Sequence, residues 1–330
     1  MRERCLKTIT ELAGEDDRVV FVGSDLGVGV MADFKARYPD RFFMEGVAEQ
    51  NLVGLAAGMA MEGRVVYLNT IATFLTRRCF EQVAVDLCMH NANVRLVGNG
   101  GGVVYAPLGP THLATEDVAI LRALPNMTIL APADAEEMAR AVRATLHHQG
   151  PVYIRVAKGH EPVVTADTAA FRIGKAVEMR DGHDALIVTT GIGLQVSLAA
   201  ADRLTAEGID ATVLHMPTIK PLDTDSLAAA AERVPAIVTV EEHSVVGGLG
   251  SAVAEYLAES DLLDGRKFRR VGFPDVFPAG YGDQAGMMRR YGITADAVAG
   301  LVRQLLTAPA SKALTGLSRS GHWPAFEKTH

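Results

Sequence analysis

A glutamate at the predicted start of an apolar helix is the strongest candidate for chemistry in this 330-residue chain. Glu49 lies in the first turn of a helix predicted over 48–61, whose turns from Leu52 to Ala60 are almost wholly apolar or small. A carboxyl group there would be desolvated, which keeps a proton available for donation. The helix dipole acts in the opposite direction and favours the anion. The residues alone therefore allow either a general acid or a helix-start carboxylate without function.

Other chemical motifs are weak or absent. Glycine-rich turns occur at 27–29, 98–102 and 191–193, but none forms a complete G-x-G-x-x-G with an acidic residue about 20 positions later, so tight turns beneath a sheet explain them. The sequence holds no Walker loop, H-E-x-x-H or G-x-S-x-G, so a hydrolase triad is not supported. Cys5, Cys79 and Cys88 have no Cys-x-x-Cys spacing, which indicates a reducing compartment and no zinc site.

These residues must be positioned by a regular alternation of strands and helices. Predicted strands cover 18–22, 41–44, 64–68, 94–97, 152–156, 185–189, 211–215, 236–240 and 268–273, and predicted helices cover 48–61, 76–90, 135–148, 194–207, 225–233, 246–259 and 294–306. Such alternation is typical of α/β proteins with a mainly parallel sheet covered on both faces. We expect two doubly wound α/β domains at 1–160 and 171–307, a linker at 161–170 and a tail at 308–330.

Composition narrows the class of protein. Apolar residues make up 48% and charged residues 22% of the chain, as in globular proteins, which excludes disorder as the main state. The net charge of −7 argues against nucleic acid or an anionic membrane as the chief partner. No window has the roughly 18 consecutive apolar residues of a membrane span. Residues 1–17 have no apolar core, so we expect a cytoplasmic protein without a signal peptide.

Several short segments, in order and spacing, resemble the thiamine-diphosphate-dependent transketolase family and its relative 1-deoxyxylulose-5-phosphate synthase. The matching segments are Glu45-Gly-Val-Ala-Glu-Gln-Asn51, Ala72-Thr-Phe-Leu75, Gly109-Pro-Thr-His112, Leu121-Arg-Ala-Leu-Pro-Asn-Met127, Ala131-Pro-Ala-Asp134, Pro151-Val-Tyr-Ile-Arg155, Glu241-Glu-His243 and Gly247-Gly-Leu-Gly250. They extend over roughly residues 1 to 305. The resemblance implies a thiamine-diphosphate pyrimidine-binding domain followed by a C-terminal domain of the transketolase type.

The resemblance assigns cofactor contacts residue by residue. Glu49 matches the glutamate that hydrogen-bonds N1′ of the cofactor's aminopyrimidine, which is acid–base catalysis relayed through a cofactor. Phe74 matches the aromatic residue that stacks on the pyrimidine, and Phe80 is expected to complete that wall. Asp25 matches an aspartate near the cofactor. Arg77 agrees with the synthase pattern Thr-Phe-Leu-x-Arg and is grouped with the cofactor site, although it could also be an exposed helix charge.

Two further residues are assigned to the substrate. His112 matches a histidine that faces the reacting carbonyl group, where it could stabilise an alkoxide or move a proton. Alternatively, His112 could simply satisfy a turn after Gly-Pro-Thr. Arg155 matches an arginine that binds the distal anion of the substrate, since its rigid fork suits a phosphate or sulfonate.

The sequence departs from the family pattern at polar substrate contacts. Leu108 stands where ordinary transketolases have an aspartate that contacts a sugar hydroxyl, and Gly100 stands where they have a histidine. Gly29 replaces a phosphate-binding serine. Each lost polar contact is worth about 1–3 kcal/mol. We therefore expect the cofactor chemistry to be retained and one substrate, a larger or more apolar carbonyl compound, to differ from an ordinary sugar phosphate.

The resemblance covers only the second half of such an enzyme. The family's diphosphate and metal domain carries Gly-Asp-Gly, which this sequence lacks. We expect the small subunit of a split transketolase whose N-terminal-type partner supplies that domain together with the Mg²⁺ or Ca²⁺ ligands. No metal ligand is therefore expected on this chain. Because the family's cofactor sites lie between chains, the resemblance also implies self-association, in a heterotetramer.

The predicted activity is transfer of a two-carbon ketol unit from a ketose to an aldehyde or another carbonyl acceptor. The alternative within the same family is a 2-oxo acid decarboxylating carboligase of the synthase or dehydrogenase-β type, which Arg77 favours. A third possibility is a non-catalytic scaffold subunit. The presence of both Glu49 and Phe74 argues against the scaffold, because loss of either residue would be its signature.

Overall fold

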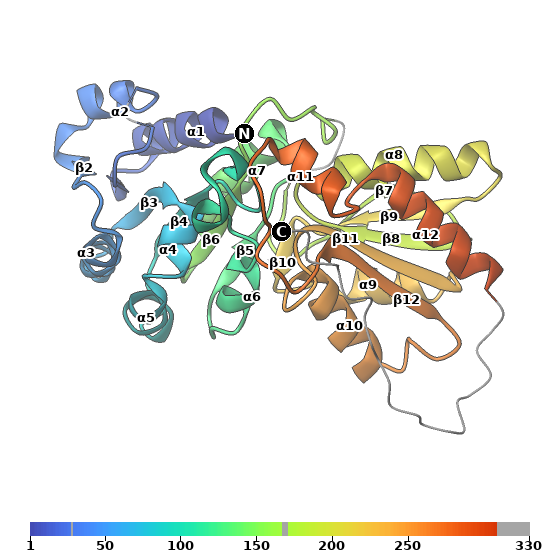
Figure 1. The fold of residues 1–330 in the computed structure, drawn as a ribbon. Helices are drawn as coiled ribbons and strands as arrows, with labels where there is room; N and C mark the ends of the chain where they lie inside the picture. The colour runs from blue at the N-terminus through green and yellow to red at the C-terminus, as the bar shows by residue number, and fades with distance from the viewer. Residues whose placement is uncertain (28, 167–170, 309–330) are drawn as a thin grey trace.

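The computed structural model describes residues 1–27, 29–166 and 171–308, which build two β-sheets flanked by helices (Figure 1). The first sheet has seven strands in the order β10-β5-β6-β4-β3-β1-β2. Its neighbouring strands run parallel except β10, which is antiparallel to β5. The strands are β1 (Val19–Gly23), β2 (Phe42–Met44), β3 (Val65–Ile71), β4 (Val94–Asn99), β5 (Thr128–Leu130), β6 (Val152–Val156) and β10 (Thr218–Lys220).

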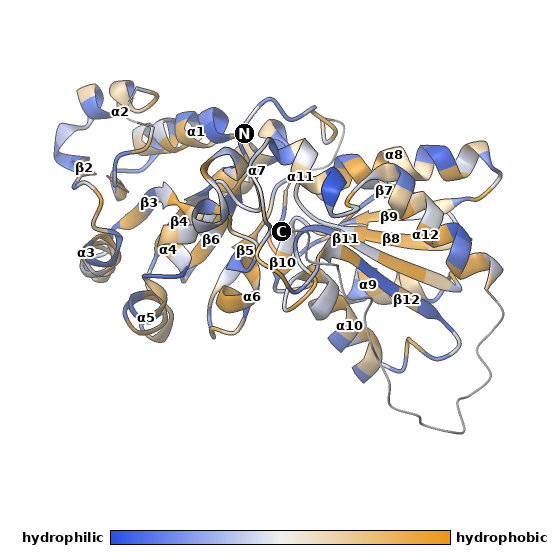
Figure 2. Cartoon of the chain, in the orientation of Figure 1, coloured by the Kyte–Doolittle hydropathy of each residue, from blue (hydrophilic) through white to orange (hydrophobic). Residues whose placement is uncertain are grey.

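Helices cover both faces of the first sheet. One face packs against α1 (Arg2–Glu15), α2 (Ala32–Arg37) and α7 (Ala135–Thr145). The other packs against α3 (Glu49–Met61), α4 (Ala72–Thr76), α5 (Phe80–Gln82), the π-helical segment η2 (Val83–Met89) and α6 (Asp117–Arg122). Most strands of this sheet are largely hydrophobic in Figure 2, and β1, β4, β5 and β6 are buried along their whole length because helices cover both faces, whereas the edge strand β2 is half-buried.

The second sheet has the strand order β12-β11-β8-β9-β7, with only β7 antiparallel to its neighbour. Its strands are β7 (Val177–Arg180), β8 (Ala185–Thr189), β9 (Ala211–His215), β11 (Ala236–Ser244) and β12 (Lys267–Phe273). The helices α8 (Gly193–Ala206), α11 (Gln284–Arg290) and α12 (Ala295–Thr307) pack on one face, and α9 (Thr224–Ala231) and α10 (Leu249–Glu259) pack on the other. The predicted fold class, two doubly wound α/β units with mainly parallel sheets, is confirmed.

Most predicted elements are present, but the structure also contains elements that were not predicted and divides one that was. The predicted helix over 76–90 is divided into α4, α5 and η2, and the Thr76 hydroxyl donates to the Ala72 carbonyl at 2.9 Å, a local bond that competes with regular helix. Helix α1 was not predicted because charges interrupt its apolar residues. Its buried side chains nevertheless form one stripe, including Cys5, Leu6, Ile9 and Leu12.

The proposed domain boundaries stay predictions. Residues 167–170 of the expected linker and residues 309–330 of the expected tail lie outside the described residues. Strand β10, which belongs to the second half of the sequence, pairs with the first sheet. No helix in the described part of the chain is long and apolar enough to span a membrane.

The topology defines where a site can form. Strand β1 pairs with β2 on one side and with β3 on the other, so the chain changes direction across the sheet at β1. Open α/β sheets bind ligands outside the carboxyl ends of their strands at such a point. Ser24, Asp25 and Thr70 lie at these ends, and α3 connects β2 to β3.

Candidate active site

Glu49 is the first residue of α3, and only 2% of it is exposed. One carboxylate oxygen, Oε1, accepts a hydrogen bond from the Thr70 hydroxyl at 3.4 Å. The other oxygen, Oε2, forms an ion pair with Nη1 of Arg78 at 3.1 Å. The predicted desolvation of this carboxyl group is confirmed.

Phe74 lies on α4 and is half-buried. The Arg78 guanidinium lies over its ring, 4.2 Å from the centroid. The His112 ring approaches Phe74 edge-on, with the centroids 5.1 Å apart. Glu49, Phe74 and His112, which are far apart in the sequence, are therefore joined by a continuous series of contacts in which Arg78 is the central residue.

Asp25 joins the same group through two hydroxyl groups. The Ser24 hydroxyl lies 3.0 Å from Asp25 Oδ1 and 2.9 Å from the Thr70 hydroxyl, which in turn donates to Glu49. Asp25 is exposed, whereas Ser24 and Thr70 are buried. A series of polar contacts thus leads from the surface at β1 to the buried carboxylate on α3, and its two hydroxyl protons serve two of the three links at a time.

His112 ends the short 3₁₀ turn η4 (Pro110–His112). Its Nδ1 lies 3.0 Å from the Thr111 hydroxyl. Arg77 holds the backbone just beyond it, since its Nη2 donates to the Leu113 carbonyl at 2.9 Å and its Nε bonds to Glu116. Arg77 therefore anchors the histidine turn and makes no contact with Glu49 among the described residues.

Leu108 and Gly100 both lie next to Tyr105, whose ring faces Gly100 and whose carbonyl accepts from the Leu108 backbone. Leu108 ends the 3₁₀ turn η3 (Ala106–Leu108) and is 52% exposed. Gly100 has a φ of +79°, and a Cβ built on it would lie 2.1 Å from the Tyr105 ring. The ring of Tyr105 thus fills the space that a side chain at position 100 would need.

Arg155 lies on β6 and is buried together with Asp117. Its Nε donates to Asp117 Oδ2 at 2.8 Å, and its Nη2 donates to the carbonyls of Ala114 and Glu242 at 3.0 and 2.9 Å. Burial alone would lower the pKa of Arg155, but the Asp117 and Glu242 carboxylates raise it overall. In this structure the guanidinium connects the two sheets, and no contact links it to Glu49 or Phe74 among the described residues.

Phe80 begins α5 and packs against the hydrophobic core between α3, η2 and the first sheet. No ring contact joins it to Phe74 in the described part of the structure. Its proposed role as part of the pyrimidine wall stays a prediction.

Sequence reasoning missed three residues of this region. Arg78 follows directly after Arg77 and was not singled out. Only its position four residues after Phe74, where helical side chains meet, could have indicated a contact with that ring. Tyr105 and Tyr281 carried no signal, because their positions depend on loops. A Cβ built on Gly109 would lie 2.9 Å from the Tyr281 ring, which is 79% exposed and comes from the second half of the chain.

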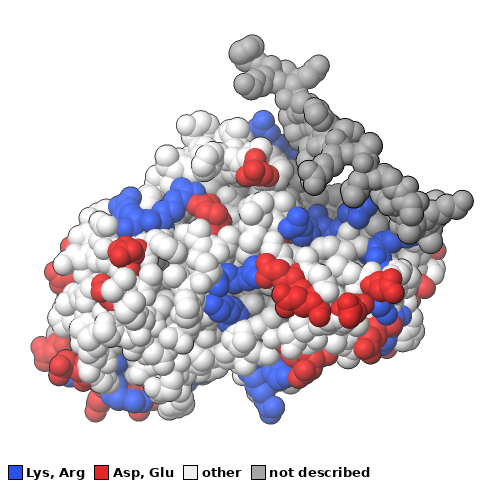
Figure 3. All heavy atoms as spheres, turned by 90° about the horizontal axis from the view of Figure 1, so that it is seen from below, with Lys and Arg blue, Asp and Glu red and all other residues white. Residues whose placement is uncertain are grey.

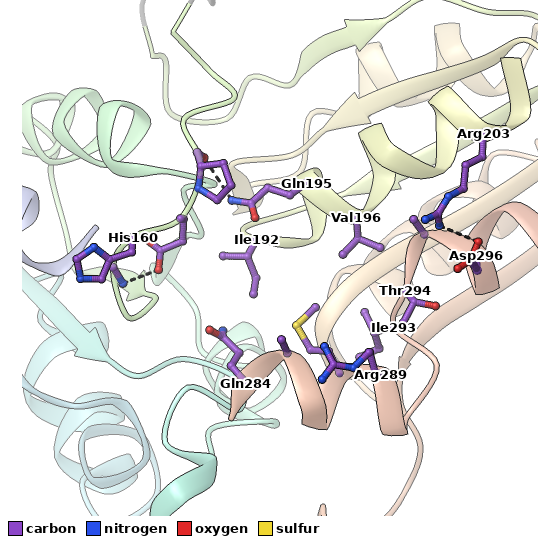
Figure 4. Close-up of a pocket in the computed structure, with 16 residues that line it drawn as sticks. His160, Ile192, Gln195, Val196, Arg203, Gln284, Arg289, Ile293, Thr294 and Asp296 are labelled. Carbon is purple, nitrogen blue, oxygen red and sulfur yellow. Dashed lines mark hydrogen bonds and ion pairs between the residues drawn. The ribbon is translucent and has the colours of Figure 1, made fainter. Parts of the chain in front are cut away.

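Two other cavities border the region between the sheets. A pocket of about 410 Å³ is lined by Arg77 and Glu116 from the first sheet's side and by Pro274 and Phe277 from the loop after β12. A second pocket of about 550 Å³, shown in Figure 4, lies between residues 159–162, α8 and the segment 284–296. It contains Arg203 paired with Asp296 and shares no lining residue with the Glu49 site. No group of three or more histidine, cysteine or acidic residues suited to a metal ion occurs in residues 1–27, 29–166 and 171–308.

Comparison with known proteins identifies the class. Residues 1–162 match the pyrimidine-binding domain of transketolase, and residues 174–298 match the transketolase C-terminal domain. A solved structure titled as a split gene transketolase, inactive beta4 tetramer, superposes with a TM-score of 0.84 at 37% identity and covers 93% of this chain and 97% of that chain.

Relatives of known sequence agree. A transketolase family protein of Sinorhizobium fredii is 42% identical over 82% of this chain and 78% of its own length. The 6-deoxy-6-sulfo-D-fructose transketolase subunit of a Clostridium strain is 36% identical over 89% of this chain and 91% of its own. The chain belongs to the transketolase family and corresponds to its pyrimidine-binding and C-terminal domains.

Proposed function

We propose that this chain is the pyrimidine-binding subunit of a split, thiamine-diphosphate-dependent transketolase. The observation that supports this best is the geometry around Glu49: a buried carboxylate and an aromatic ring together hold a flat group that carries N–H donors. In this structure that group is the Arg78 guanidinium. An aminopyrimidine ring can make the same two interactions, because its face stacks on an aromatic ring and its edge forms hydrogen bonds with a carboxyl group.

The residues of this chain would act as follows. When bound, thiamine diphosphate supplies the carbon nucleophile for cleaving and forming carbon–carbon bonds. Glu49 holds a proton at the edge of the pyrimidine, and Phe74 supports the ring face. His112, whose Nδ1 lies 3.0 Å from the Thr111 hydroxyl, would offer Nε2 to the oxygen of the reacting carbonyl group. Diphosphate and its Mg²⁺ or Ca²⁺ are assigned to the partner subunit.

The side chains near His112 support an acceptor that is larger or more apolar than an ordinary sugar phosphate. Leu108 is exposed just before the histidine turn, and Tyr281 lies against Gly109, the residue that precedes that turn. Phe277 lines the neighbouring pocket and is 79% exposed. We propose that these apolar surfaces contact the acceptor. Arg155 binds Asp117 and two backbone carbonyls in this structure, and its role toward the distal anion stays a prediction.

Association of this chain with itself and with a partner is proposed from the outer face of α3. That face exposes Asn51, Gly54, Gly58 and Met61, with Leu55 and Met59 half-buried, and carries no charge between Glu49 and Glu62. Figure 2 shows little hydrophilic colour on this helix, and Figure 3, which looks from the side where α3 lies in Figure 1, shows broad uncharged areas. Two glycines four positions apart let another backbone approach closely.

The direct test is the variant Glu49→Gln in the enzyme reconstituted with its partner subunit. Gln cannot give up or hold the proton, so we expect turnover to fall by about 10²- to 10⁴-fold, while thermal unfolding stays close to that of the wild type. Glu62→Gln, an exposed change at the other end of α3, is the matched control. Unchanged turnover in Glu49→Gln would refute the assignment.

The same reconstituted enzyme distinguishes the reactions. A panel of ketose donors and aldehyde acceptors would show ketol transfer, and equal preference for xylulose-5-phosphate and ribose-5-phosphate over all other pairs would contradict the apolar acceptor. Release of carbon dioxide from pyruvate would favour the carboligase alternative. No activity, with wild-type cofactor binding also absent, would favour a scaffold.

A further inference from the structure

Arg78 makes the two contacts on which the proposed cofactor site depends. Its guanidinium lies over the Phe74 ring at 4.2 Å, and its Nη1 lies 3.1 Å from Glu49 Oε2. We propose that in the cofactor-free chain Arg78 occupies the place of the cofactor's aminopyrimidine, so that the cofactor must displace it. This inference rests on the proposed function and assigns a role to a residue that the family resemblance did not.

The shape and chemistry of the guanidinium explain why it can stand in for the ring. A guanidinium is planar and delocalised, stacks on aromatic faces and presents N–H groups at its edge to carboxylates. A centroid distance of 4.2 Å is direct contact, so a second flat group cannot lie on the same area of Phe74 at the same time. The carboxylate of Glu49 is likewise shared between Arg78 and Thr70 only, among the described residues.

Arg78 is placed so that it can leave. It lies in the turn between α4 and α5, and 44% of its side chain is exposed. Within the described residues, Glu49 is its only ion-pair or side-chain hydrogen-bond partner. Arg77 differs, because it is bound both to Glu116 and to the Leu113 carbonyl. Rotation of the Arg78 side chain into water would thus break one ion pair and uncover Phe74 without moving the backbone.

The ion pair has a physical reason in the cofactor-free state. A buried carboxylate without a partner is strongly destabilising, and Glu49 is almost completely buried. Arg78 provides the compensating charge until the pyrimidine edge replaces it. Binding therefore exchanges one partner of Glu49 for another, and the observed affinity is lower than it would be for an open site.

The test uses the chain alone with the cofactor's pyrimidine fragment, 4-amino-5-hydroxymethyl-2-methylpyrimidine, titrated by ligand-observed NMR. Arg78→Met keeps the length of the side chain but loses the plane and the charge. We expect it to bind the fragment about tenfold more tightly than the wild type, which is the scale of one hydrogen bond to a charged group. Arg303→Met is the matched control, because Arg303 is 43% exposed and also pairs with a glutamate, Glu207, far from the site.

Each outcome decides between the inference and the function on which it rests. Tighter binding by Arg78→Met alone, lost when Glu49→Gln is added, supports the inference. Equal or weaker binding by Arg78→Met, with measurable binding by the wild type, overturns the inference and leaves the proposed function intact. No binding by any variant overturns the inference, and turnover of Glu49→Gln in the reconstituted enzyme then decides the proposed function separately. If Arg78→Met does not fold, Arg78→Lys, which keeps the charge and loses the plane, must still bind more tightly than the wild type.

Discussion

A group of buried ionisable residues connects the two halves of this chain. Asp117 on α6 binds Arg155 and accepts a hydrogen bond from the Tyr153 hydroxyl at 2.6 Å. Burial alone would raise the pKa of Asp117, but the charges of Arg155 and His243 and the hydrogen bonds of Arg155 and Tyr153 lower it overall. On the other side of the group, burial raises the pKa of Glu242 to about 7, against the opposing charge of Arg155.

Glu242 is expected to make stability depend on pH. Its oxygen Oε1 accepts from the Val103 backbone and from Gln284, both at 2.9 Å, so it connects β11 to the first half of the chain and to α11. A carboxyl group with a raised folded-state pKa favours folding while it is protonated. Its contribution is therefore complete below its unfolded-state pKa and is lost as the pH rises through about 7.

Glu242→Gln should remove this dependence, because the amide keeps an oxygen that can accept and never ionises. We expect its free energy of unfolding, relative to the wild type, to rise by about 3 kcal/mol between pH 4 and pH 8.5. Urea unfolding at several pH values measures this difference. A difference that stays constant with pH would show that Glu242 does not titrate in this range.

The sequence identified the residues of the site that have a chemical type and a fixed helical position. Glu49 and His112 were predicted, and the structure brings both into the same group around Phe74, while their roles stay predictions. Arg78, Tyr105 and Tyr281 were not found, because a sequence does not show which side chain fills space left by a glycine or a missing ligand. The role proposed for Arg155 came from its position in a motif, which carries no information about the buried Asp117 beside it.

Among the elements, α7 shows how one side chain can hold several segments together. Asp134 is its N-cap, and Oδ1 accepts from the backbone of Glu136 and Glu137, both at 2.9 Å. The other oxygen, Oδ2, accepts from the backbone of Val164 and Thr165, both at 2.8 Å. The motif Ala-Pro-Ala-Asp134 thus fixes both the start of a helix and the chain that leaves the first sheet.

Asp134→Ala should therefore cost more than loss of an ordinary cap. Removing a typical capping side chain costs about 1 kcal/mol. Here two further N–H groups also lose their acceptor, the buried one of Thr165 and the partly buried one of Val164, so we expect a total of about 3 kcal/mol. Denaturant unfolding would measure it beside Asp283→Ala, the more exposed cap of α11, which accepts from Gly286 alone. Equal losses in the two variants would contradict this account.

Elements with clean periodicity were predictable and the irregular ones were not. The strands Val152–Val156, Ala185–Thr189 and Ala211–His215 have the predicted bounds, because short β-branched runs between helices have no competing structure. The short strands β5, β7 and β10 were missed, since three or four residues carry too little pattern. Tertiary pairing, and not local propensity, makes them strands.

At the scale of the whole molecule, the outer face of α3 is an exposed surface without charged side chains between Glu49 and Glu62. Gly54 and Gly58 are exposed, and a Cβ built on either would meet no atom within 4 Å. Gly58→Arg should therefore fold as the wild type does but oppose close approach by another chain. We expect sedimentation to show a shift toward the monomer, with dissociation constants raised about 10-fold or more.

Ala258→Arg is the control for this variant, because Ala258 is exposed on α10. A wild type that is monomeric at every concentration would contradict self-association. Identical oligomers in wild type and Gly58→Arg would place the interface on another face.

Strand β10 links the two halves in a way that a boundary drawn along the sequence does not show. It leaves the second half, lies antiparallel on β5 and closes that edge of the first sheet, and the Ala131 backbone bonds to the carbonyl of Pro217 and accepts from Gly191. A protease cut at residues 158–166 would break the covalent connection but leave this strand pairing in place. The two fragments would therefore stay bound to each other. If the first fragment were produced without the second, the edge of its sheet at β5 would be unpaired, and unpaired sheet edges promote aggregation.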